Sequence, residues 1–155
     1  MGKHRIGRPG ARLEPLWVAH LALIGTMSLH AIDHTLQARG LAALTPQVLT
    51  GGTALLVVAL ATLPMTLRHH PRAPLAAAIV GWSTALGVSA SHLAPYWSPF
   101  SDPYVDLSLG AYSWLVMLSE VAAAVVFGLL GLRALSTSAI GMTLRPTGRR
   151  HAERA

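Results

Sequence analysis

The sequence predicts an all-α, polytopic integral membrane protein whose four transmembrane helices run up, down, up and down in one bundle. Three observations lead to this prediction. The chain is 52% hydrophobic and only 12% charged, whereas a soluble domain carries about 25% charged residues. The apolar residues gather in four segments, each close to the roughly 20 residues with which a helix crosses about 30 Å of hydrocarbon. The connections between the segments are short, which makes neighbouring helices antiparallel.

The four predicted helices carry very few charges. They cover residues 16–37, 48–67, 75–93 and 111–132. The second and third contain no charged residue, while the first contains Asp33 and the fourth contains Glu120. A backbone in hydrocarbon must satisfy its own hydrogen bonds, so segments of this length are expected to be helical. Basic residues precede the first apolar segment, as they do in a signal peptide. The apolar segment is too long for a signal peptide, so we expect an uncleaved helix.

The basic residues predict an orientation. Of the 12 Lys and Arg residues, all but Arg39 lie on one side of the four predicted helices. Because basic residues collect in the cytoplasm, we expect an inner or plasma membrane protein with both termini cytoplasmic. The connections 38–47 and 94–110 then face out. The basic tail 1–15 and the tail 133–155, which we expect to be disordered, suit anionic lipid. They lack the interleaved aromatics of a nucleic-acid stacking platform, so no nucleic-acid partner is expected.

A row of small residues on the third predicted helix suggests a helix contact. Ser83, Gly87 and Ser91 recur at every fourth position and therefore share a face. Rows of this kind let two helix backbones approach closely. We expect the row to pack inside the bundle, and a homodimer contact is the alternative.

Ionisable residues inside the apolar segments mark the candidate site. His30 and His34 are four residues apart, so they share one face of the first helix, with Asp33 on the flank. The orientation places these residues and His92 near the same outer boundary. Glu120 lies roughly 14 Å deep at 1.5 Å per residue, about one turn below His30. Ionisable groups in hydrocarbon usually face a partner or a cavity. We therefore expect a His30–Glu120 contact, an outer cluster of His30, Asp33, His34 and His92, or both.

The connection 94–110 is expected to cover this end of the bundle. Its aromatic residues suit a membrane interface, and its three prolines, four residues apart, enforce a non-helical path. Asp102 and Asp106 fall within reach of His34 and His92. The segment is either an interfacial cap with turn-forming Ser-Asp-Pro chemistry or a lid that contributes a ligand.

Three kinds of chemistry suit these residues. The first is a divalent metal site, in which His30, His34, His92 and Asp102 bind Zn²⁺ or Cu²⁺ through imidazole and carboxylate groups. The absence of cysteine excludes thiolate ligands and thiol catalysis. The second is a b-type haem held between His92 and either His30 or His34. The third is a proton or ion relay, with Glu120 as the buried acid and the histidines as the exit.

The same side chains also suit structural roles, as hydrogen bonds between helices or contacts with lipid headgroups. His20, near the inner interface, is expected to be structural. We expect a non-catalytic ligand-binding, transport-related or accessory subunit with an outward-facing His/Asp pocket. A membrane redox or metal protein and a structural subunit of a larger complex are the alternatives. The lipid bilayer is the expected partner, with other membrane subunits or a second copy as further candidates, and the default expectation is no cofactor.

Overall fold

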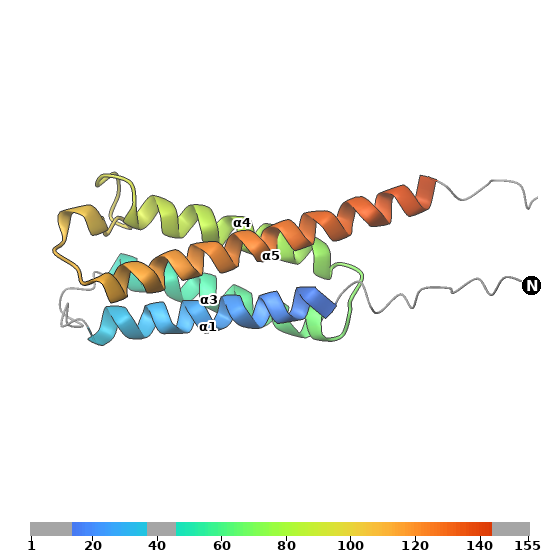
Figure 1. Cartoon of the computed structure of the whole chain (residues 1–155), viewed down its shortest axis with the longest axis horizontal. Coiled ribbons are helices and arrows are strands. Elements are labelled where there is room, and N and C mark those ends of the chain that lie inside the picture. The colour runs from blue at the N-terminus through green and yellow to red at the C-terminus, as the bar shows by residue number, and fades with distance from the viewer. Residues whose placement is uncertain (1–13, 37–45, 144–155) are drawn as a thin grey trace, which may run out of the picture.

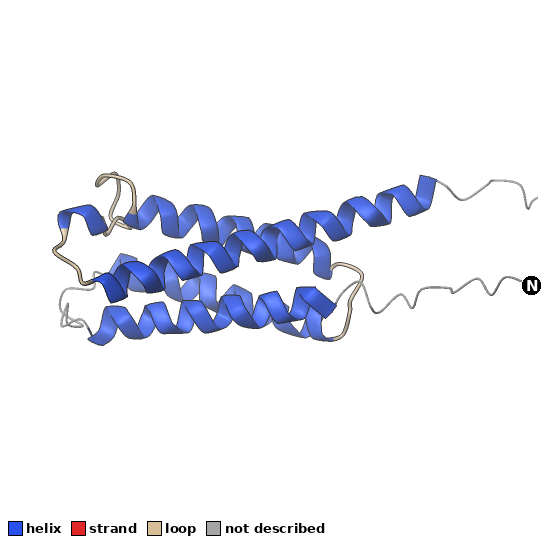
Figure 2. Cartoon of the chain, in the orientation of Figure 1, coloured by secondary structure: helices blue, strands red, loops and turns tan. Residues whose placement is uncertain are grey.

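The structure, a computed structural model, describes residues 14–36 and 46–143. Within these ranges it contains α1 (Glu14–Leu36), α3 (Pro46–Leu67), α4 (Ala73–His92), the 3₁₀ helix η2 (Tyr104–Asp106) and α5 (Ala111–Thr143). The described residues form no strand (Figure 2). The predicted all-α class is therefore confirmed. The predictions for residues 1–13, for the connection after α1 and for residues 144–155 concern residues outside the described ranges.

The four α-helices lie side by side and alternate in direction along the chain (Figure 1). α5 packs against α4 and α1, while α3 packs against α1 and α4. Three segments are long and apolar enough to cross a membrane: Pro15–Leu36, Ala73–His92 and Ala111–Ser138. In α3 the apolar stretch found among the described residues, Gly51–Leu67, is shorter. The arrangement agrees with an up-down-up-down order of helices.

The end of α5 departs from the predicted bounds. We expected the helix to stop at residue 132 and the following residues to be disordered, but α5 continues to Thr143. No proline lies between Ala111 and Pro146, and Ala134 and Leu135 are strong helix formers. The disordered tail is therefore a wrong prediction for residues 133–143.

Small residues let α4 and α5 meet backbone to backbone. A Cβ atom added to Gly81 would lie 2.4 Å from the backbone nitrogen of Gly128, and one added to Gly131 would lie 2.5 Å from the backbone nitrogen of Ala78. Real side chains do not approach so closely, so both positions require glycine. The close contact between helices is thus made by a different face of α4 from the Ser83, Gly87 and Ser91 row.

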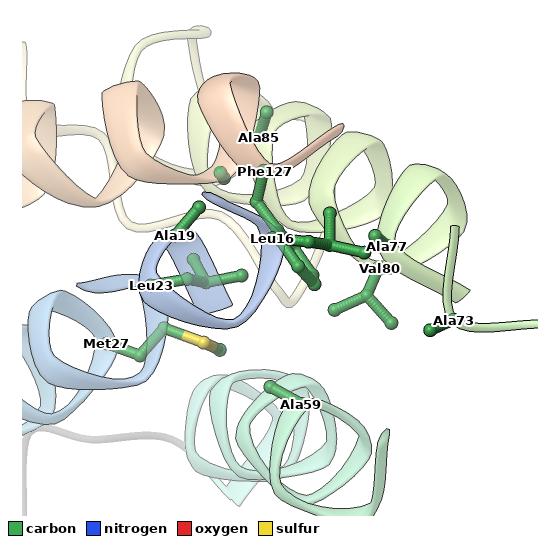
Figure 3. Close-up of a cluster of buried hydrophobic side chains, with 11 residues drawn as sticks. Leu16, Ala19, Leu23, Met27, Ala59, Ala73, Ala77, Val80, Ala85 and Phe127 are labelled. Carbon is green, nitrogen blue, oxygen red and sulfur yellow. The ribbon is translucent and has the colours of Figure 1, made fainter. Parts of the chain in front are cut away.

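The apolar core draws residues from all four α-helices (Figure 3). Leu23 of α1 and Phe127 of α5 are fully buried at its centre. The other members of this cluster are Leu16, Ala19, Met27, Ala59, Ala73, Ala77, Val80, Ala85 and Ala124.

His20 is a polar residue buried within this region. Its Nδ1 lies 3.0 Å from Oγ1 of Thr66, and its Nε2–H donates to the carbonyl oxygen of Ala59 at 2.9 Å. Both ring nitrogens are therefore satisfied by α3, so the side chain ties α1 to α3. This arrangement agrees with the structural role expected for His20.

Thr84 carries a polar group that the fold leaves unsatisfied. Its side chain is fully buried on α4, and among the described residues its hydroxyl has no hydrogen-bond partner. An unsatisfied buried polar group costs about 1–3 kcal/mol. We expect Thr84→Val to raise the free energy of unfolding by about 1 kcal/mol, measured by thermal unfolding of the detergent-solubilised protein. Thr84→Ser keeps the hydroxyl and serves as the control. A valine variant that is less stable than the wild type would contradict this prediction.

Candidate functional site

Two helices that end at the same end of the molecule bring three histidines together. The last two turns of α1 carry His30 and His34 on one face, and α4 ends at His92 (Figure 1). The ring centroids lie 4.7 Å apart for His30 and His34, 5.0 Å for His30 and His92, and 5.4 Å for His34 and His92. Each histidine offers one ligand nitrogen, and these nitrogens all lie within 4.8 Å of one another. We call these three residues the histidine triad.

Glu120 of α5 lies against the triad. The Nδ1–H of His30 donates to Oε2 of Glu120 at 2.5 Å, and both side chains are buried. The contact expected from the helix depths is therefore present. The other ring nitrogen, Nε2, accepts a hydrogen bond from the hydroxyl of Tyr104 at 2.9 Å. His30 thus links Glu120 and Tyr104 in one hydrogen-bonded chain across three elements.

Sequence reasoning missed Tyr104. This residue opens η2 and is only 1% exposed. The centroid of its ring lies 4.5 Å from that of the His92 ring, and the ring packs edge-on against the ring of Trp114. From the sequence, the aromatic residues of this segment are expected at the membrane interface, where such rings usually collect. The position of Tyr104 in the sequence could have indicated its role. It follows Asp102 by two residues, and Asp102 is expected to reach the cluster.

The segment after α4 folds back onto the end of that helix. The indole N–H of Trp97 donates to the carbonyl oxygen of Ala90 at 2.7 Å. The backbone N–H of Asp102 donates to the carbonyl oxygen of Ser91 at 2.8 Å. These bonds satisfy carbonyls that a helix C-terminus leaves free. Inside the segment, Oγ of Ser101 accepts the backbone N–H groups of Trp97 and Ser98. The segment is therefore a hydrogen-bonded cap that fixes Asp102 beside the triad.

Asp102 contacts the triad with two of its oxygen atoms. Nδ1–H of His92 donates to the backbone carbonyl of Asp102 at 2.9 Å. The carboxylate oxygen Oδ2 lies 3.8 Å from Nδ1 of both His34 and His92. Asp106, the second acid expected near the cluster, is exposed. Asp102 is therefore the acidic residue of the cap that the structure brings to the histidines.

Asp33 faces α5. It is buried, and its Oδ1 accepts a hydrogen bond from the hydroxyl of Ser113 at 3.2 Å. Asp33 is not among the residues whose ligand atoms converge. The structure therefore gives it a contact between α1 and the first turn of α5.

A pocket of about 720 Å³ opens beside the triad, between α1, α3 and α4. The three histidines and Glu120 supply its ionisable lining. The Ser83, Gly87 and Ser91 row lines this pocket as well. The row that we expected to pack against another helix therefore forms part of a cavity wall.

The charges of the described residues favour a cation at this end of the molecule. The acids Asp102 and Glu120 lie at the triad. The connection between α3 and α4 and the last third of α5 lie toward the opposite end of the helices (Figure 1). They carry the basic residues Arg68, Arg72 and Arg133. Within the described ranges, carboxylates thus accumulate beside the histidines without a nearby Lys or Arg to neutralise them.

The triad has the composition and the surroundings of a transition-metal site. Three histidines form a common zinc ligand set that leaves one position open, and nitrogens bound at about 2.0–2.1 Å around a tetrahedral ion lie about 3.4 Å apart. Side-chain shifts of roughly 1 Å would close the triad from its 4.8 Å span to that spacing. Metal-binding histidines usually donate their other N–H to a carboxylate or a backbone carbonyl. Nδ1 of His30 and of His92 meet these two kinds of acceptor in Glu120 and Asp102.

The packing of the rings bears on the choice between an ion and a haem. Two histidines that ligate one haem iron lie on opposite faces of the macrocycle. Here the His30 and His34 rings stack directly at 4.7 Å, and His92 lies tilted against both. This geometry favours a single small ion.

Comparison of the chain with protein-family models, with curated proteins and with solved structures finds no match. A function for the site is therefore inferred from the chemistry and geometry of its own residues.

Proposed function

We propose that the chain is a multi-pass membrane protein that binds one divalent transition-metal ion, Zn²⁺ or Cu²⁺, through His30, His34 and His92. The observation that carries this proposal is the convergence of one nitrogen from each histidine within 4.8 Å. Neutral imidazole is a ligand that suits both metals. The acids at this end of the molecule add electrostatic support, and Asp102 stands close enough to approach the ion from the cap.

The membrane part of the proposal is that all four α-helices cross the bilayer. It is supported by three helices of sufficient length and apolarity and by the apolar stretch of α3. All Lys and Arg residues except Arg39 lie on one side of these helices in the sequence, so both termini are cytoplasmic in the inner or plasma membrane. The triad then lies in the outer half of the bilayer.

We assign the protein a ligand-binding, transport-related or accessory role, with no catalytic residue. Glu120 is the buried acid of the site, but its carboxylate is engaged by His30. It therefore acts as a positioning residue, which orients the His30 ring through Nδ1. The ion would take the place of the Tyr104 hydroxyl at Nε2.

Metal loading of the full-length chain tests the proposal. The detergent-solubilised protein is incubated with Zn²⁺ or Co²⁺, freed of excess metal and analysed for metal per chain, with an absorption spectrum of the cobalt form. We expect about one ion per chain and cobalt bands in the visible range, as a site with three nitrogen ligands requires. Protein that retains no metal would overturn the proposal. A Soret band in the purified protein would replace the small ion with haem.

Glu120→Gln tests the positioning role. Glutamine keeps the shape of the side chain and an acceptor for His30 but removes the charge. Changes to the residues that orient metal ligands weaken metal binding by about 10–100-fold, and we expect about tenfold, measured as a Zn²⁺ dissociation constant by competition with a chelating dye. Asp106→Asn, which removes the same charge from an exposed side chain at the same end, is the matched control. Equal effects of the two variants would show that only long-range charge matters.

A further inference from the structure

The pocket beside the histidine triad is lined by ionisable side chains together with apolar and small ones. Its volume of about 720 Å³ falls within the roughly 300–1,000 Å³ of pockets that hold small organic ligands. Its lining combines the triad and Glu120 with the apolar side chains of Leu55, Leu56 and Leu86. A ligand that matches this combination has a polar head and a hydrocarbon body.

Two glycines add no side chain to this space. Gly52 of α3 and Gly87 of α4 both line the pocket. A Cβ atom added to Gly52 would meet nothing within 4 Å, and one added to Gly87 would meet only Cδ1 of Leu55, at 3.6 Å. A larger side chain at Gly87 therefore fits the backbone and fills the pocket.

The pocket reaches the outer apolar surface of the helices. Leu86 is 66% exposed, Trp97 58% and Phe100 47%, and all three belong to the lining. In the proposed transmembrane orientation Leu86 faces hydrocarbon, and Trp97 and Phe100 lie at the interface. A lipid chain can therefore enter from the bilayer, without passing through water.

The volume suits one hydrocarbon chain. If each methylene takes roughly the 30 Å³ share of a water molecule, a chain of about 16 carbons fills about 480 Å³ and two such chains about 960 Å³. The pocket of about 720 Å³ holds the first and is too small for the second. The volume inside the pocket thus matches one hydrocarbon chain, which favours a single-chain molecule as the occupant.

The charges beside the histidine triad favour a ligand with a neutral head group. Glu120 and Asp102 balance the two charges of one divalent ion held by neutral histidines. A carboxylate or phosphate head would then bring an unbalanced charge into a largely apolar site, which is costly. A hydroxyl oxygen brings no net charge and can take the position that three histidine ligands leave open.

We propose that the pocket binds a neutral single-chain amphiphile of the long-chain alcohol class. Its hydroxyl oxygen occupies the open position of the ion, and its chain lies along Leu55, Leu56 and Leu86. The place of the head rests on the proposed metal function, whereas the place of the tail rests on the pocket and on the proposed transmembrane orientation.

Trp97 provides the readout, because it lines the pocket. The full-length chain is placed in phosphatidylcholine nanodiscs, and quenching of its tryptophan fluorescence by chain-brominated hexadecanol is titrated. Trp97→Phe gives the background from the other tryptophans. We expect saturable quenching of Trp97 that weakens about tenfold when the metal is removed by a chelator, the equivalent of one strong polar contact. Brominated palmitate, with an anionic head, should bind about tenfold more weakly than the alcohol.

Paired glycine variants test the place of the tail. Gly87→Leu fills the pocket and should abolish the saturable quenching while the metal content stays at the wild-type level. Gly25→Leu introduces the same side chain on α1, where a Cβ atom meets nothing within 4 Å, and should change neither property.

The outcomes separate this proposal from the metal proposal. Normal metal content with quenching that does not saturate, or that Gly87→Leu leaves intact, overturns the lipid site and leaves the metal site standing. Tighter binding of palmitate than of the alcohol overturns the neutral head. Protein that takes up no metal but binds the alcohol saturably overturns the metal proposal and, with it, the place of the head.

Discussion

Replacing His92 by alanine is expected to abolish binding of Zn²⁺ at micromolar concentrations. The variant removes one of three ligands and leaves His30 and His34, both from α1. Loss of a residue that merely orients a ligand weakens binding by about 10–100-fold, so loss of a ligand itself should exceed about 100-fold. The measurement is metal per chain after loading and washing, together with the dissociation constant from chelator competition.

His92 is a better target than His30, because the fold depends less on it. Removal of His30 would leave the buried Glu120 without the N–H that donates to it, and an unpaired buried acid destabilises a protein strongly. His92 donates instead to a backbone carbonyl of the cap. Circular dichroism should therefore show unchanged helicity. His70→Ala, which alters an exposed histidine in the connection between α3 and α4, is the matched control. Equal metal content in both variants would refute the triad as the binding site.

Hydropathy and helical periodicity predict much of this molecule. The four helices follow from the length of the apolar segments, and the pairing of His30 with His34 follows from a spacing of four residues. Depth along antiparallel helices places Glu120 near His30, which the structure shows as a direct contact. These features depend on one helix at a time or on simple distances along helix axes, so a single sequence contains them.

Features that depend on rotation of a helix about its axis are beyond such reasoning. α4 has two rows of small residues, one with Gly81 and Ala85 and one with Ser83 and Gly87. Either row could pack against a neighbouring helix by composition alone. The structure places the first against α5 and leaves the second to line the pocket. The row that faces α5 is determined by how the helices pack in three dimensions, and sequence periodicity does not contain this information.

The path of the cap is unpredictable for a related reason. Tyr104 reaches His30 because side-chain and backbone hydrogen bonds fold residues 93–103 back onto α4. Such bonds join atoms that no periodic pattern relates. A sequence shows that the segment is rich in proline and aromatic residues, but not which aromatic ring turns inward.

Gly81→Leu is expected to separate α4 from α5 and to unfold the protein or lower its stability severely. The Cβ atom alone would lie 2.4 Å from the backbone of Gly128 and 2.6 Å from the carbonyl oxygen of Ala124. Backbone atoms of a helix cannot move aside as a flexible side chain can. Overpacking of a core usually costs about 1–3 kcal/mol, and a clash with backbone should exceed this range. Thermal unfolding in detergent, followed by circular dichroism, provides the measurement.

Two variants make this result specific to the helix contact. Gly25→Leu carries the same substitution in a helix position with no atom within 4 Å of the added Cβ, and should be neutral or slightly stabilising because leucine forms helices better than glycine. Gly131→Leu meets the backbone nitrogen of Ala78 at 2.5 Å and should reproduce the effect of Gly81→Leu. If Gly81→Leu and Gly131→Leu both unfold at the temperature of Gly25→Leu, α4 and α5 do not pack backbone to backbone. The triad would then lose its support, because α4 carries His92 and α5 carries Glu120.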